Sequence, residues 1–313
     1  RCRPVNRAYL CAVRLRLAGL ILAFPAAGLA APAPPIVDVT WLQQHLCSSS
    51  IVVLDLRRSV RNFAAQHVPC SVHSDYYGGG WRASRDGVEN MVPPVAHLEA
   101  LIGGLGIGND NHVVLVTAAV DMFSAAELAR VYFIFRYLGH GAVSILDGGM
   151  DAWTAEWDND VEVGEAEPVP IVFSARPRSD MVASKAEVHA AMASGKTLVD
   201  MRNNDHYLGI NSTHVVVRSG TIPGAANLPM TWLTVNEGLR FRAPTQLRML
   251  WTLAGLNPES PQILFCNSGL ESAVGWLALG AQLGNSAVKL YDGSLAEWSA
   301  DPSLPMTAAV ALD

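Results

Sequence analysis

The sequence predicts an α/β fold with two similar domains, each built on a parallel sheet covered by helices. Short apolar runs rich in β-branched residues alternate with longer segments that carry apolar side chains at helical spacing. Such alternation indicates strands joined by crossover helices, which lie on both faces of the sheet. The same order of short motifs then occurs twice along the chain. About 280 residues follow the first thirty, which is enough for two domains of ordinary size.

The internal repeat rests on three landmarks that occur in the same order in both halves. An apolar run ends in Asp-x-Arg, a Val-Pro or Ile-Pro segment follows, and an Asp-Gly turn precedes a tryptophan. Asp55 and Asp147 are 92 positions apart, and so are Asp200 and Asp292. Three ordered landmarks with equal outer spacing indicate a duplicated domain.

Each element of the first copy has its own signal. Residues 52–54 and 113–116 are short apolar runs between turn residues, as expected of buried parallel strands. Residues 124–137 carry apolar side chains at helical spacing, and residues 142–146 form the next strand. The polar, glycine-rich stretch 81–94 is predicted to be a long surface loop. The proline-rich stretch 162–177 breaks periodicity and is predicted to be the linker.

The first thirty residues have the pattern of a secretory signal peptide. Five arginines and no acidic residue precede an apolar stretch, residues 17–29, that is too short to cross a bilayer comfortably. Gly28 and Ala30 suit a cut after Ala30, which makes residues 1–30 the predicted signal peptide. An uncleaved membrane anchor is the alternative. Export predicts a periplasmic or secreted protein with no membrane attachment after cleavage.

The charge balance argues against nucleic acid as a partner. The whole chain has a formal net charge of −6, with 22 Lys and Arg against 28 Asp and Glu. Loss of residues 1–30 removes five arginines and no acidic residue, which leaves a net charge of −11. Because phosphate binding needs a basic face, this acidic body is a poor match for nucleic acid.

Three cysteines remain after the predicted cut: Cys47, Cys70 and Cys266. An odd number in an oxidising compartment leaves at least one thiol unpaired. A bridge between Cys47 and Cys70 stays open at this point, because the sequence does not reveal their geometry. No Cys-x-x-Cys or clustered Cys/His spacing indicates a metal site.

Cys266 is the candidate nucleophile. The apolar run 262–265 stops at Cys266, a short polar loop with Gly269 follows, and a helical segment begins near Ala273. Backbone N–H groups of such a loop, together with a helix N-terminus, favour a thiolate over a thiol. The alternative is an inert buried cysteine, which is common in protein cores.

The repeated motifs resemble those of tandem-domain rhodaneses. The sharpest matches are residues 143–149, Val-Ser-Ile-Leu-Asp-Gly-Gly, and residues 219–229, which contain Thr-Ile-Pro-Gly-Ala. The resemblance implies two rhodanese-like domains, each a five-stranded parallel sheet flanked by helices. It places a non-catalytic domain at 36–160, a linker at 161–180 and a catalytic domain at 181–306. Cys266 stands at the family's catalytic position, whereas the matching strand of the first copy runs into Thr117.

The resemblance also implies a chemistry. A sulfurtransferase of this kind takes a sulfane sulfur from 3-mercaptopyruvate or thiosulfate onto the cysteine as a persulfide, and a thiol or cyanide then removes it. No metal or organic cofactor is needed. In an exported protein, a thiol-reducing protein partner would keep Cys266 active.

Several further site residues follow from the resemblance. Mercaptopyruvate sulfurtransferases have the loop Cys-Gly-Ser-Gly-Val-Thr, in which the serine moves a proton together with a first-domain histidine; Ser268 and His67 match these. Of two substrate-binding arginines, Arg218 matches one and His206 replaces the other. The remaining substrate-binding candidates lie in the loop itself: Asn267, Gly269, Leu270, Glu271 and Ser272. Glu271 is unusual beside an anionic donor, so either it points to solvent or the substrate is less anionic.

Three other functions compete with the sulfurtransferase. Cysteine phosphatases on related folds need Cys-x5-Arg, but the sixth residue after Cys266 is Ser272. A persulfide carrier or protein-docking module would keep Cys266 and Gly269 without turnover of small donors. A folded but inactive domain pair is the third alternative. The Asp-x-Arg pairs, Asp55 with Arg57 and Asp200 with Arg202, are predicted to be structural ion pairs.

Overall fold

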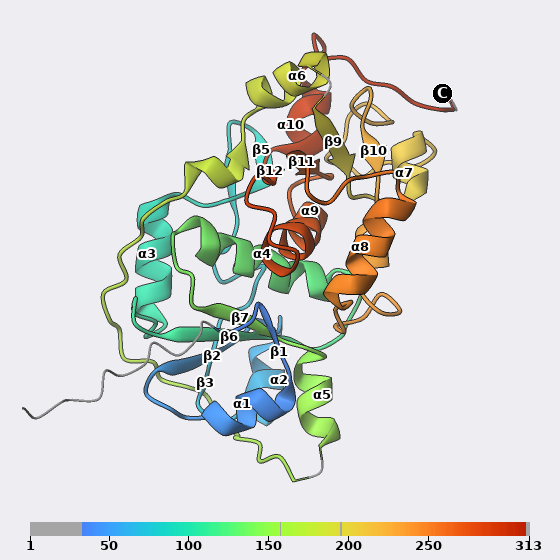
Figure 1. The fold of residues 1–313 in the computed structure, drawn as a ribbon. Coiled ribbons are helices and arrows are strands. Elements are labelled where there is room, and N and C mark those ends of the chain that lie inside the picture. The colour runs from blue at the N-terminus through green and yellow to red at the C-terminus, as the bar shows by residue number, and fades with distance from the viewer. Residues whose placement is uncertain (1–32, 157, 195, 311–313) are drawn as a thin grey trace, which may run out of the picture. The chain divides into compact units, whose positions relative to one another are not determined.

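The computed structural model describes residues 33–310 except 157 and 195. The predicted signal peptide and its cut after Ala30 lie outside these residues. Figure 1 shows helices packed on both faces of two separate sheets. Within the described part of the chain, no helix is both long and apolar enough to cross a membrane.

The first domain contains a five-stranded parallel sheet, as predicted. Its strand order is β1-β7-β6-β2-β3, and every neighbouring pair runs parallel. The strands are β1 (Ile36–Val37), β2 (Ile51–Asp55), β3 (Ser71–His73), β6 (His112–Val116) and β7 (Val143–Leu146). The helices are α1 (Val39–His45), α2 (Val60–Ala65), α3 (Val95–Gly104), α4 (Ser124–Tyr137) and α5 (Gly149–Ala155). The predicted strands and the 124–137 helix are therefore confirmed.

The second domain repeats this arrangement. Its strand order is β10-β9-β11-β12-β8, again with every pair parallel. The strands are β8 (Val182–Ala183), β9 (Thr197–Asp200), β10 (Ala226–Asn227), β11 (Gln262–Phe265) and β12 (Lys289–Tyr291). The helices are α6 (Lys185–Ser194), α7 (Asn204–Leu208), α8 (Pro244–Leu253), α9 (Glu271–Trp276) and α10 (Ser294–Ala300). Short 3-10 helices cover Ser179–Met181 and Met230–Leu233, and a π-helical segment, Leu277–Gln282, continues α9.

The two domains share one hydrophobic core. Val113 and Leu115 of β6 face a cluster that includes α4, α9 and Leu264 of β11. The alternate residues of β6, Val114 and Val116, face a separate cluster under α1 and α5. Figure 1 shows α4 and α9 side by side between the sheets, and Phe133 of α4 meets Trp276 of α9 edge to face at 5.2 Å. Because side chains alternate across a strand, each sheet has one outer face and one face toward the other domain.

Both predicted ion pairs are present and buried. Arg57 lies 2.6 Å from Asp55, and Arg202 lies 2.7 Å from Asp200. Each arginine also donates to a backbone carbonyl, that of Gln66 in the first domain and that of Gly220 in the second. The pairs thus fasten the end of a central strand to the segment that returns to the sheet edge.

The prediction of a long surface loop at 81–94 is wrong. This stretch contains an antiparallel hairpin of β4 (Ala83–Arg85) and β5 (Val88–Met91). Trp81 is fully buried, and its indole N–H donates to Ser74 Oγ at 2.9 Å. Polar residues at the tip of the hairpin are exposed, whereas Asn90 faces Ser268 of the second domain, and polarity alone does not distinguish these two environments.

Cys47 and Cys70, whose pairing the sequence left open, form a disulfide with their Cα atoms 5.4 Å apart. The Cys70 backbone N–H also donates to the Glu162 carboxylate at 2.8 Å. Glu162, in the predicted linker 161–180, exchanges two backbone hydrogen bonds with His67. The start of the linker is therefore fastened to the first domain.

Each domain forms hydrogen bonds and an ion pair with the Asp-Gly turn of the other. The Asp292 carboxylate accepts the Val92 backbone N–H at 2.8 Å and pairs with Arg130, both from the first domain. The Asp147 carboxylate accepts the Phe241 backbone N–H at 2.8 Å and meets Arg240 at 3.3 Å, both from the second domain. The repeat in the sequence thus reappears as a reciprocal set of contacts between domains.

Candidate active site

Cys266 stands where β11 ends, and α10 holds its backbone. The Cys266 N–H donates to Ser294 Oγ at 3.1 Å, and its carbonyl accepts the Leu295 N–H at 3.0 Å. Gly269 turns the following loop with φ +81°, and a Cβ there would lie 3.0 Å from the Asp292 carbonyl oxygen. Glycine is therefore required for the loop to pack against the Asp292 turn.

The structure contradicts the expectation that the loop favours a thiolate. Cys266 is fully buried, and burial raises the pKa of its thiol to about 11, with the Glu271 carboxylate adding to the rise. The backbone amides of Ser272 and Ser268 and the Ser272 hydroxyl, 3.6 Å from the sulfur, act in the opposite direction but do not prevail. Loss of hydration outweighs these donors, which favours the thiol over the thiolate at Cys266.

Glu271 is buried beside the thiol and does not point to solvent. Its Oε2 atom accepts the Asn267 side-chain N–H at 3.0 Å, and its exposed fraction is 8%. Burial raises the pKa of this carboxyl to about 7. Of the two explanations offered for Glu271, the solvent-facing one is therefore excluded. A carboxyl that titrates near neutrality beside a thiol can accept a proton.

The first domain covers the Cys266 loop. The Arg130 guanidinium, fully buried on α4, donates to the Gly269 carbonyl at 3.3 Å, to the Asn90 carbonyl at 3.1 Å and to Asp292. The Asn90 side-chain N–H lies 3.5 Å from Ser268 Oγ. Both domains therefore build the site, and Arg130 and Asn90 cover the Cys266 loop.

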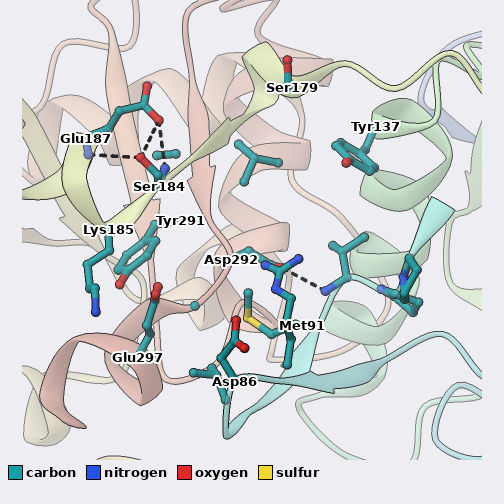
Figure 2. Close-up of a pocket in the computed structure, with 18 of the residues that line it drawn as sticks. Asp86, Met91, Tyr137, Ser179, Ser184, Lys185, Glu187, Tyr291, Asp292 and Glu297 are labelled. Carbon is teal, nitrogen blue, oxygen red and sulfur yellow. Dashed lines mark hydrogen bonds between the residues drawn. The ribbon is translucent and has the colours of Figure 1, made fainter. Parts of the chain in front are cut away.

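A cavity of about 620 Å³ lies next to the loop, between the hairpin and the second sheet. Figure 2 shows Met91 and Asp86 of the hairpin facing Tyr291, Asp292 and Glu297 of the second domain. Asp292 borders both this cavity and the Cys266 loop, but Cys266 does not line the cavity. Access to the sulfur therefore requires movement of the cover formed by Asn90 and Arg130.

The family profile of the rhodanese-like domain matches residues 38–156 and 184–301. The chain belongs to the rhodanese family. Thiosulfate sulfurtransferase of Cricetulus griseus is 31% identical over 278 residues, which cover 84% of this chain and 91% of the relative. Human 3-mercaptopyruvate sulfurtransferase is 30% identical over 245 residues, 77% of this chain and 80% of the relative.

The solved structure of SseA from Escherichia coli, described as a 3-mercaptopyruvate sulfotransferase, is similar with a TM-score of 0.73 and 26% identity. The match covers 84% of this chain and 99% of SseA. The curated relatives are named as sulfurtransferases, and this rhodanese is a sulfurtransferase.

Three predicted site residues of this rhodanese are engaged away from the loop. The His67 ring stacks on Phe63, its Nδ1–H donates to the Phe63 carbonyl at 2.9 Å, and its Nε2 lies 3.9 Å from the Glu162 carboxylate. The Arg218 guanidinium donates to four backbone carbonyls, those of Trp298, Ser299, Asp301 and Leu304. His206 lies on α7, and among the described residues its buried Nδ1 has no hydrogen-bond partner.

These contacts bear on two of the predicted roles. The N–H groups of the Arg218 guanidinium donate to carbonyls at the end of α10 and in the turn after it. These contacts give Arg218 a structural role and oppose the predicted role as a substrate clamp. His67 is held within the first domain by its packing on Phe63 and by the linker, and among the described residues its hydrogen bonds do not reach the Cys266 loop, so its role in proton transfer stays a prediction. Within the loop, Asn267, Glu271 and Ser272 are buried, while Ser268 and Leu270 are half-buried.

Sequence reasoning missed Arg130, Asn90 and Arg82. Arg82 donates to the Asn90 side-chain oxygen at 2.8 Å, which extends the site into the first domain. Arg130 carried one signal, because it is a charged residue within the largely apolar helical run 125–135. Asn90 and Arg82 carried none, because the site joins segments about 180 positions apart in the sequence.

Proposed function

We propose that this rhodanese transfers a sulfane sulfur from a small donor to a thiol or cyanide through a persulfide on Cys266. The observation that carries the proposal is the buried Cys266 thiol with the Glu271 carboxylate beside it in one loop. We rank 3-mercaptopyruvate first as the donor and thiosulfate second, because Asn267 and Ser268 give the loop no positive charge for a dianion.

In the first half-reaction, Glu271 takes the thiol proton and the Cys266 sulfur attacks the sulfane sulfur of the donor. A sulfur–sulfur bond forms on Cys266. The bond from the sulfane sulfur to the rest of the donor breaks, and sulfite or the enolate of pyruvate leaves with the electron pair. The proton held by Glu271 is available to the enolate carbon, which yields pyruvate.

In the second half-reaction, the acceptor attacks the outer sulfur of the persulfide. The sulfur–sulfur bond breaks, and Cys266 leaves as a thiolate that takes a proton. Cyanide becomes thiocyanate, and a thiol becomes a persulfide. The amides of Ser268 and Ser272 and the Ser272 hydroxyl stabilise negative charge on the Cys266 sulfur at both stages.

We also propose that the protein acts in the periplasm or outside the cell. The Cys47–Cys70 disulfide supports this location, because disulfides persist in oxidising compartments. Such a compartment would require a thiol-reducing protein partner to return oxidised Cys266 to the thiol.

The test is sulfur transfer to cyanide with each donor, for the wild type and Cys266→Ser. We expect thiocyanate formation by the wild type and its loss in the variant, with the mass of one added sulfur atom on wild-type protein after incubation with donor alone. A folded wild type with a titratable Cys266 thiol but no turnover of either donor would contradict the enzyme and favour a persulfide carrier.

A further inference from the structure

The proposed donors are anions, yet the second domain offers them little positive charge. The loop positions after Cys266 are neutral at Asn267 and Ser268 and acidic at Glu271. Arg218 donates to carbonyls of its own domain, and Arg202 is paired with Asp200. The charge that receives the donor must therefore come from elsewhere.

Three arginines of the first domain are linked to one another: Arg58 and Arg82 lie over the same Tyr77 ring, and Arg82 and Arg130 both donate to Asn90. Two of them are already neutralised. Arg130 pairs with Asp292, and Arg58 lies 2.7 Å from Glu127 and 3.2 Å from Asp121. Among the residues that the structure describes, Arg82 forms no ion pair, so it is the member of this group with uncompensated charge.

Packing holds the Arg82 guanidinium in one orientation. It lies over the Tyr77 ring, 4.6 Å from its centroid, and Arg58 lies over the same ring at 4.3 Å. Arg82 Nη1 donates to the Asn90 side-chain oxygen at 2.8 Å, and Nε is 3.4 Å from the Tyr77 carbonyl. A stacked guanidinium loses little side-chain entropy when it binds a ligand, which favours binding.

Asn90 connects this cation to the catalytic loop. Its backbone is in the left-handed region at φ +63°, its carbonyl accepts Arg130, and its side-chain N–H reaches Ser268 Oγ at 3.5 Å. A separation of 3.5 Å marks a weak hydrogen bond that a better acceptor can replace. Asn90 therefore lies against the loop, with its side chain beside Ser268 and its carbonyl on Arg130.

On the basis of the proposed function, we infer that Arg82, with Asn90, binds the carboxylate or sulfonate group of the donor and sets the sulfane sulfur over Cys266. Two oxygens of the anion match the fork of the guanidinium, which a single ammonium does not reproduce. The Asn90 amide turns from Ser268 to the donor as the site fills. Donor selectivity is then supplied by the β4–β5 hairpin of the domain that lacks the nucleophile.

The first measurement is equilibrium binding of thiosulfate to Cys266→Ser protein, which cannot turn over, by isothermal titration calorimetry. Addition of Arg82→Gln should raise the dissociation constant about 10- to 100-fold, as loss of a charge-assisted pair does. Arg85→Gln is the matched control, since it removes the same charge from the same hairpin without a contact to Asn90, and it should change binding less than about 2-fold. Equal binding by the two variants would overturn the inference.

The second measurement separates the two half-reactions. Arg82→Gln in the active enzyme should raise KM for 3-mercaptopyruvate and thiosulfate about 10- to 100-fold with a smaller change in kcat. Reaction of the preformed persulfide with cyanide should keep its wild-type rate, because no donor is bound then. An equal loss in both half-reactions would indicate a structural role and contradict donor binding.

If Arg82→Gln folds poorly, Arg82→Lys provides a second test of donor binding by Arg82. It preserves the charge and loses the fork, so we expect a KM between those of the wild type and Arg82→Gln. An unchanged KM in folded Arg82→Lys would contradict bidentate binding. If the wild type turns over neither donor, the proposed function fails first, and that outcome differs from an active wild type with unchanged Arg82 variants.

Discussion

The two domains build the same strand end, but only one equips it for chemistry. Thr117 follows β6 as Cys266 follows β11, and both carbonyls accept a matching N–H, from Met150 at 2.8 Å and Leu295 at 3.0 Å. The segments beyond them differ. Residues 117–123 contain no glycine and lead to α4, whereas residues 266–270 turn through Gly269 and lead directly to Glu271. The fold thus provides an equivalent strand end in each domain, and the two domains differ in the loop that follows it.

The reciprocal contacts between domains differ in burial. Arg130, which meets the catalytic domain's Asp292, has a fully buried side chain, whereas Arg240, which meets Asp147, is 58% exposed. The hairpin that brings Val92 to Asp292 also brings Asn90 to Ser268. The first domain therefore covers the Cys266 loop through a buried contact, while the equivalent segment of the second domain makes an exposed contact beside Thr117.

The largest effect should come from an attempt to transfer the nucleophile between domains. We expect Thr117→Cys in a Cys266→Ser background to keep less than about 0.1% of wild-type transfer to cyanide, because loss of a nucleophile removes nearly all turnover. The segment 117–123 lacks the glycine turn and the Glu271–Asn267 pair that serve Cys266. Recovery of more than about 1% of wild-type activity would show that strand position, and not the loop, determines reactivity.

The next prediction compares the two contacts between the domains, Arg130 with Asp292 and Arg240 with Asp147. Arg130→Met leaves Asp292 without its buried partner and should lower the free energy of unfolding by about 3–5 kcal/mol. Arg240→Met removes an exposed contact with Asp147 and should cost at most about 1 kcal/mol. Urea unfolding followed by tryptophan fluorescence compares the two. The double variant Arg130→Met with Asp292→Asn should recover part of the lost free energy of unfolding. Similar small losses in Arg130→Met and Arg240→Met would contradict a stabilising role for the buried Arg130–Asp292 pair.

The smallest of these effects concerns Glu271, the buried carboxyl that follows Cys266 in the loop of the second domain. We expect kcat/KM of the wild type to rise with pH through about 7, where Glu271 loses its proton and becomes able to accept one. Glu271→Gln should lower transfer about 100-fold at pH 7.5, and the rise near pH 7 should disappear.

A pH profile of the donor half-reaction measures both quantities, with Cys266 alkylation as the control for thiol ionisation. Removal of the Glu271 charge should lower the pKa of Cys266, so alkylation should become faster in Glu271→Gln even as transfer slows. Faster transfer at neutral pH in this variant would mean that Glu271 only represses the thiol.

Features that depend on short-range pattern were predictable from the sequence alone. Apolar runs ending at Asp55, Asp200 and Cys266 identify strand ends, because a buried parallel strand needs consecutive apolar residues on both faces. An arginine two positions after an aspartate can reach it without help from the rest of the chain, so both ion pairs followed. The helix at 124–137 followed from its spacing, and the duplicated order of motifs determined the two parallel sheets.

The tertiary structure decided what each site residue does. Dehydration raises the pKa of the Cys266 thiol and of Glu271, and no local pattern records how completely a loop is buried. Arg218 stands where a substrate clamp was expected, but its N–H groups donate to carbonyls at the end of α10 and in the turn after it. Arg82, Asn90 and Arg130 reach the loop only because the domains close on each other, which joins segments far apart in the chain. Sequence spacing thus located the candidate nucleophile, and burial and contacts between the domains determined its surroundings and the direction in which its pKa moves.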